Sequence, residues 1–87
     1  MCAMEKIASC QIAFTPIVSD DYMEDVDKVL KIIDNSGLEY EVGSLSTFVR
    51  GEKSRVLNLI SQIYDTMDDI TNFSMDIKIS NICGCGK

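Results

Sequence analysis

The sequence predicts an α+β fold whose elements follow one another in the order βαββαβ. Four segments alternate apolar and polar residues, which is the period of a half-buried strand. Two further segments repeat apolar residues at the spacing of an amphipathic helix. Because each strand has a single apolar face, both helices should cover one face of a four-stranded antiparallel sheet, the arrangement called ferredoxin-like.

The first strand is expected over residues 7–17, where side chains alternate between two faces. Its apolar face holds Cys10, Ile12 and Phe14, and its polar face holds Ser9, Gln11, Ala13 and Thr15. Cys10 should therefore be a small core residue. Pro16 and the polar cluster after it should end the strand and open a helix, with Ser19 or Asp20 as the N-terminal cap.

The first helix is expected over residues 21–35 and should stop at Gly37, since glycine readily adopts the left-handed conformation that closes helices. Its apolar stripe consists of Tyr22, Val26, Val29, Leu30 and Ile33. A second strand follows, in which Leu38, Tyr40 and Val42 alternate with two glutamates.

Gly43 and Ser44 suit a tight turn into a third strand over residues 45–50. A second helix is expected over residues 52–67, with a stripe of Val56, Leu57, Ile60, Ile63, Tyr64 and Met67. The last strand has Phe73, Met75, Ile77 and Ile79 on one side and Ser74, Asp76, Lys78 and Ser80 on the other. Asp76 and Lys78 suggest an ion pair, either across strands or between subunits.

Length and composition indicate one domain over residues 1–87, with segments 1–5 and 83–87 as flexible tails. A chain this short buries only roughly 60–65% of its unfolded surface, so a second copy would add stability. No stretch reaches the length of a membrane helix, and the N-terminus lacks the basic-then-apolar pattern of a signal peptide. We therefore expect a cytoplasmic protein without membrane insertion.

The net charge of −6 argues against a nucleic-acid partner. Affinity for nucleic acids comes largely from cationic groups that release counterions from phosphates. RNA-binding domains of this fold also stack bases on aromatic rings of the open sheet face. The open face of the predicted sheet shows Ser9, Gln11, Ala13 and Thr15, and we expect no ring on it. We expect no nucleic-acid binding.

Catalysis is not expected either. The chain contains no histidine, and no two carboxylates are spaced to share an acid–base site. Apolar strands that carry a few hydroxyls and one arginine suit the binding of a small polar molecule instead. The sequence therefore predicts a binding protein that needs no cofactor.

Three segments in register resemble the YkoF-like thiamine-binding proteins: residues 6–17, which begin KIA and end FTPI, LSTFVRG at 45–51 and SNICG at 80–84. The resemblance implies a ferredoxin-like domain that binds thiamine or its hydroxymethylpyrimidine moiety without chemistry, in salvage or transport. It also implies a homodimer or homotetramer assembled through the sheet face. The ending Cys83-Gly84-Cys85-Gly86 departs from the family, which more usually has a proline after its cysteine.

The candidate ligand-binding residues are Phe14, Thr15, Ser46, Thr47, Phe48 and Arg50. An aminopyrimidine needs hydrogen-bond donors, acceptors and a flat apolar wall, and a thiazolium cation suits an aromatic face. Some of these residues also have a purely structural interpretation. Phe14 continues the core face, Thr47 is a good strand former, and Arg50 could be solvated or pair with Glu52 for little energy.

Two other functions remain open. The domain could be a self-associating interaction or regulatory module that binds no small ligand. Cys83 and Cys85 could instead carry a soft metal, although thiolate sites usually need four ligands. The same Cys83-Gly84-Cys85 segment could also close over a pocket, because glycine allows close approach.

Overall fold

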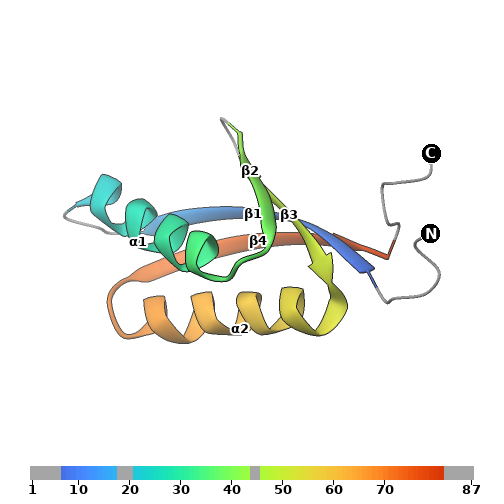
Figure 1. Ribbon diagram of the computed structural model, residues 1–87. Coiled ribbons are helices and arrows are strands. Elements are labelled where there is room, and N and C mark those ends of the chain that lie inside the picture. The colour runs from blue at the N-terminus through green and yellow to red at the C-terminus, as the bar shows by residue number, and fades with distance from the viewer. Residues whose placement is uncertain (1–6, 18–20, 44–45, 82–87) are drawn as a thin grey trace.

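The computed structural model describes residues 7–17, 21–43 and 46–81. The elements are β1 (Ile7–Ile17), α1 (Tyr22–Asn35), β2 (Glu39–Val42), β3 (Thr47–Glu52), α2 (Lys53–Asp68) and β4 (Asn72–Ser80). The predicted order βαββαβ is confirmed (Figure 1). Both predicted tails, the proposed cap residues Ser19 and Asp20, and the Cys83-Gly84-Cys85 segment lie outside the described residues.

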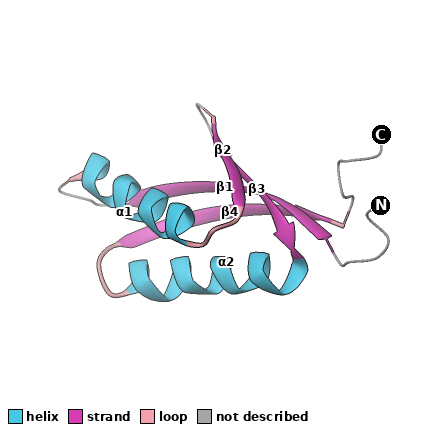
Figure 2. Cartoon of the chain, viewed as in Figure 1, coloured by secondary structure: helices cyan, strands magenta, loops and turns pink. Residues whose placement is uncertain are grey.

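The sheet has the strand order β2-β3-β1-β4, and all neighbouring pairs are antiparallel. Both helices lie on one side of it (Figure 2), so the fold is the predicted ferredoxin-like arrangement. β1 and β3 are central, whereas β2 and β4 form the two edges. In the described part of the chain, no helix combines the length and hydrophobicity that a membrane crossing requires.

The core lies between the sheet and the two helices. It consists of Ala8, Cys10, Ile12, Val29, Ile33, Leu38, Val49, Val56, Leu59, Ile63 and Met67. Cys10 is buried as expected, and this burial raises the pKa of its thiol. The face that β1 turns toward the helices is therefore the one its alternation predicts.

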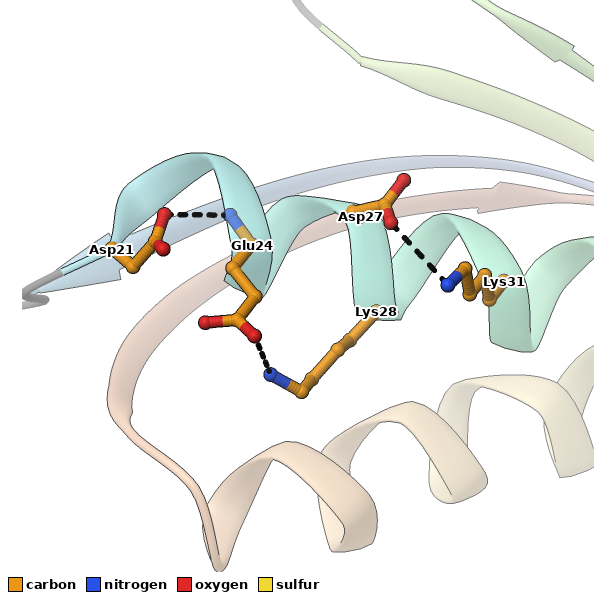
Figure 3. Close-up of polar contacts among 5 residues, drawn as sticks. All are labelled: Asp21, Glu24, Asp27, Lys28 and Lys31. Carbon is orange, nitrogen blue, oxygen red and sulfur yellow. Dashed lines mark hydrogen bonds and ion pairs between the residues drawn. The ribbon is translucent and has the colours of Figure 1, made fainter.

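The start of α1 differs from the prediction. Asp21 is the N-cap, and its Oδ1 accepts a hydrogen bond from the backbone N–H of Glu24 at 3.1 Å (Figure 3). The prediction placed the cap at Ser19 or Asp20, because all three residues are good caps and the sequence does not show where the turn ends. The predicted stop is confirmed, since Gly37 has a φ of 77°.

The apolar stripe of α2 is narrower than predicted. Val56, Leu59, Ile63 and Met67 are buried, whereas Leu57 and Tyr64 are 48% and 53% exposed. Leu57 and Tyr64 each follow a buried residue by one position, which turns them about 100° around the helix. Tyr22, which the prediction also placed in the stripe of α1, is the first residue of that helix and is exposed.

Candidate functional site

The six candidate residues divide between the two faces of the sheet. Thr15, Ser46, Phe48 and Arg50 belong to the open face, and Phe14 and Thr47 belong to the face that the helices cover. The candidates divide in this way because successive side chains of a strand point to opposite faces of the sheet. Neighbours such as Ser46 and Thr47 therefore do not point into one site.

Thr47 is recessed on the helix-facing side of β3. It is 8% exposed and lies between Ile12 of β1 and Val42 of β2 in the sheet register. The described residues give its hydroxyl no hydrogen-bond partner, and none of their fully buried polar side-chain atoms is left unsatisfied. The hydroxyl of Thr47 therefore keeps some access to solvent, and it can donate to or accept from a small polar molecule.

Two exposed apolar side chains of β2 lie beside Thr47 on the same face of the sheet. Val42 is 53% exposed, and Tyr40 lies two residues before it on the same face. The Tyr40 hydroxyl donates a hydrogen bond of 2.9 Å to Asp34 Oδ1 at the end of α1. That hydrogen bond to a carboxylate raises the pKa of Tyr40. The contact joins β2 to α1 and orients the tyrosine ring.

Phe14 belongs to an aromatic cluster that joins β1, β4 and α2. Its ring lies 5.1 Å from that of Phe73, which in turn meets Tyr64 edge-on at 5.3 Å. Aromatic pairs at these separations stabilise the packing of the elements that carry them. This placement favours the structural interpretation of Phe14.

The open face carries an aromatic ring after all. Phe48 is exposed there, between Gln11 of β1 and Glu41 of β2. The expectation that this face has no ring considered only the first strand and was wrong. Of the two cross-strand neighbours of Phe48, Glu41 is acidic and Gln11 is neutral, so neither is the cationic group that attracts phosphates.

Arg50 has a different partner from the one considered. Its Nη2 lies 2.7 Å from Glu39 Oε1, directly across from it on β2, rather than pairing with Glu52. A cross-strand pair could not be predicted without the register of β2 against β3. Glu39 is well exposed, so the pair contributes little to stability.

The other two candidates, Thr15 and Ser46, lie near the end of β1 and the start of β3. Thr15 is exposed and faces Ser74 across the β1–β4 pair. Ser46 is half-buried, and its backbone carbonyl accepts a hydrogen bond of 2.8 Å from the N–H of Gly43. That bond closes the connection between β2 and β3.

Two hollows lie elsewhere on the surface. One of about 220 Å³ is lined by Ile7, Ala8, Lys53, Leu57, Ile79, Ser80 and Asn81, where β1 begins and β4 ends. The other lies on α2 beside Asn58 and Gln62. Among the described residues, no group of three or more histidine, cysteine or acidic side chains could hold a metal ion.

Sequence reasoning missed a buried carboxylate on α1. Asp25 and Thr47 are the two buried polar side chains among the residues that the structure describes. Asp25 precedes the buried Val29 and Ile33 by four and eight positions. That spacing places all three on one helix face, so it could have identified Asp25.

Comparison with known proteins identifies the family. The family model described as thiamine-binding protein matches residues 10–83. The chain belongs to this family. Its members include the YkoF-like proteins that the sequence resembles. Among curated proteins, none matches the chain significantly.

Solved structures of proteins from three bacteria share the fold. A candidate thiamine biosynthesis/salvage protein from Thermotoga maritima is 24% identical with a TM-score of 0.80, over 90% of this chain and 86% of its own. The domain of unknown function DUF77 from Bacillus cereus is 25% identical with a TM-score of 0.79, over 98% and 85%. A Streptococcus pneumoniae protein is 18% identical with a TM-score of 0.80, over 85% and 84%.

Proposed function

We propose that this domain binds thiamine or its hydroxymethylpyrimidine moiety without transforming it, and that it serves thiamine salvage or transport. The observation that carries the proposal is membership of the thiamine-binding protein family over residues 10–83. The similar protein from Thermotoga maritima, described as a candidate for thiamine biosynthesis or salvage, agrees with it. The lack of histidine in the chain supports binding without acid–base chemistry.

The helix-facing side of β3 fits the pyrimidine best. Thr47 offers a recessed hydroxyl without a partner among the described residues, and Tyr40 and Val42 offer the flat apolar wall. Asp25 is buried on the face of α1 that also carries Val29 and Ile33 of the core. A carboxylate there would accept a hydrogen bond from the exocyclic amine or balance the charge of the thiazolium.

The open face offers a second candidate site for the same ligand. Phe48 lies directly across from Glu41, so an aromatic face and a carboxylate stand side by side there, as a thiazolium cation would require. Arg50, Ser46 and Thr15 belong to this set. A ligand cannot contact both sets through the sheet, so experiment can separate them.

Substitutions at two adjacent positions of β3 test whether the domain binds the ligand and which face of the sheet holds it. Thr47→Val keeps the shape of the side chain and removes the hydroxyl, whereas Phe48→Leu removes the ring on the opposite face. In calorimetric titrations with thiamine and with hydroxymethylpyrimidine, we expect saturable binding to the wild type. Losing one hydrogen bond should weaken the binding of Thr47→Val about tenfold, and Phe48→Leu should bind like the wild type.

Other results would count against the proposal. Folded protein that binds neither ligand would refute the function. Loss of binding in Phe48→Leu with full binding in Thr47→Val would move the site to the open face. Thr66→Val on the exposed side of α2 is the matched control for the hydroxyl deletion and should bind normally.

A further inference from the structure

The charges around the proposed thiamine site bear on the chemical form of the ligand. Thiamine is a cation because of its thiazolium ring, whereas each of its phosphate esters carries a strongly anionic group as well. A phosphate monoester adds about −1.5 to −2 charges at neutral pH. Both forms contain the aminopyrimidine that we place beside Tyr40 and Thr47. The charged side chains near these two residues therefore determine which form binds.

Asp34 places a carboxylate at the rim of the site. Its Oδ1 accepts a hydrogen bond of 2.9 Å from the hydroxyl of Tyr40, the ring of which forms part of the apolar wall. Asp34 belongs to the last turn of α1, which contains no basic residue. The unpaired carbonyl groups of a helix end carry partial negative charge. The carboxylate and the helix end therefore both attract a cation and repel a phosphate.

Glu41 adds a second carboxylate from β2, which is an edge strand of the sheet. Its chain neighbours Tyr40 and Val42 face the helices, whereas Glu41 belongs to the open face. Consecutive Cα atoms lie about 3.8 Å apart, and charges act over about 8 Å at physiological salt, so Glu41 contributes to the potential at the site. The ion pairs of the described residues include neither Asp34 nor Glu41. We call these two residues the acidic rim.

The basic residues of the elements around the site are paired with carboxylates. The strand β2 has no basic residue, and α1 and β3 together have three. Their pairs are Lys28 with Glu24 (3.5 Å), Lys31 with Asp27 (3.6 Å) and Arg50 with Glu39 (2.7 Å). Each pair has no net charge, so it neither offsets the acidic rim nor attracts a phosphate strongly.

The other described cations belong to α2 and β4. Arg55 reaches the end of α1, where its Nη2 donates a hydrogen bond of 2.7 Å to the carbonyl of Ser36. This contact offsets part of the charge of the helix end and leaves the acidic rim unpaired. Lys53 follows β3 at the end remote from Thr47, and Lys78 lies on the opposite edge strand from β2. Within the described ranges, a phosphate at the site would therefore find no uncommitted cation.

We propose that the site selects unphosphorylated, cationic thiamine over thiamine phosphates, and that the acidic rim determines this preference. The inference rests on the proposed function and adds the class of ligand that the site binds. A phosphate beside the rim would lose part of its hydration without gaining a cationic partner. It would also lie close to two like charges, whereas the thiazolium ring is attracted by the same two carboxylates.

Parallel calorimetric titrations of the full chain with thiamine and with thiamine diphosphate test the preference. At physiological salt, we expect the diphosphate to bind at least about fivefold more weakly than thiamine. The ratio of the two affinities should increase when salt is lowered to about 0.01 M, because the Debye length then rises from about 8 to about 30 Å. Equal or tighter binding of the diphosphate, or a ratio that does not depend on salt, would overturn the proposal.

Neutral variants of the acidic rim test its role. Asp34→Asn/Glu41→Gln removes both charges and keeps an oxygen that can accept the hydrogen bond from Tyr40. In this variant the two affinities should differ by less than about twofold. Asp65→Asn/Asp68→Asn removes the same number of charges from exposed positions of α2 and should keep the wild-type ratio. Far-ultraviolet circular dichroism checks the folding of both variants.

The results separate failure of this inference from failure of the proposed function. A folded wild type that binds neither thiamine nor hydroxymethylpyrimidine would refute both. A wild type that binds thiamine and its diphosphate equally well would keep the function and overturn the preference. A wild-type ratio that persists in Asp34→Asn/Glu41→Gln, or one that is lost in the α2 control, would overturn the role of the acidic rim.

Discussion

Thr47 and Phe48 are neighbours in the chain, yet their side chains enter opposite layers of the molecule. Composition alone marks this stretch as a candidate site, because hydroxyls, a ring and an arginine stand together. It does not separate the residues that share a surface. The alternation of side chains along β3, together with its register against β1, separates the candidates that face the helices from those on the open face.

Burial of Cys10 should make stability depend on alkaline pH. The thiol's pKa is raised by burial from its usual 9.0, so the unfolded chain ionises first. The contribution of the neutral thiol to stability is complete below the pKa that Cys10 has in the unfolded chain. It is lost as pH rises through the pKa of Cys10 in the folded protein. In urea titrations under reducing conditions, the wild type should have a higher free energy of unfolding than Cys10→Ala at neutral pH, and this difference should shrink at alkaline pH. A constant difference would contradict this prediction.

At the scale of elements, local pattern predicted each helix and strand but left their ends uncertain by one or two residues. The third strand begins at Thr47 and ends at Glu52, whereas the sequence suggested residues 45–50. Strand ends depend on pairing, and β3 extends as far as its register with β1 continues, to Ile7 across from Glu52. Such ends follow from tertiary contacts rather than from propensity.

Removal of the cap of α1 should destabilise the domain. Asp21 accepts the N–H of Glu24, and acidic residues in the first turn also favour the positive end of the helix (Figure 3). Asp21→Ala should lower the free energy of unfolding by about 1 kcal/mol. Asp27→Ala, which loses only an exposed pair with Lys31, should cost less in the same denaturant titration. An equal loss of unfolding free energy in Asp21→Ala and Asp27→Ala would argue against a stabilising cap at Asp21.

The end of β3 depends on a close approach that only glycine permits. A Cβ at Gly51 would collide with Cδ2 of Leu38, which is buried in the core. Gly51→Ala should therefore destabilise the domain by about 1–3 kcal/mol through overpacking. A double variant with Leu38→Ala, measured by thermal and urea unfolding, should show less than the sum of the single costs. Additive costs would mean that the two residues do not collide.

At the scale of the whole molecule, the fold follows from periodicity and the site does not. Four half-buried strands and two amphipathic helices have few ways to bury their apolar faces, so βαββαβ already implies the sheet that is observed. The recessed position of Thr47 and the uncovered edge of β4 depend on which strands are neighbours. Leu57 and Tyr64, which look like core residues in the sequence, are exposed beside that edge.

The central claim is that this domain holds a thiamine-like molecule on the helix-facing side of β3. Titration of isotope-labelled protein with thiamine, followed by amide chemical shifts in NMR spectra, tests it most directly. We predict saturable shifts centred on Tyr40, Val42 and Thr47, with the ligand recovered unchanged. Folded protein whose spectrum stays the same with thiamine and with hydroxymethylpyrimidine, or shifts confined to Asn58 and Gln62 on α2, would contradict the claim.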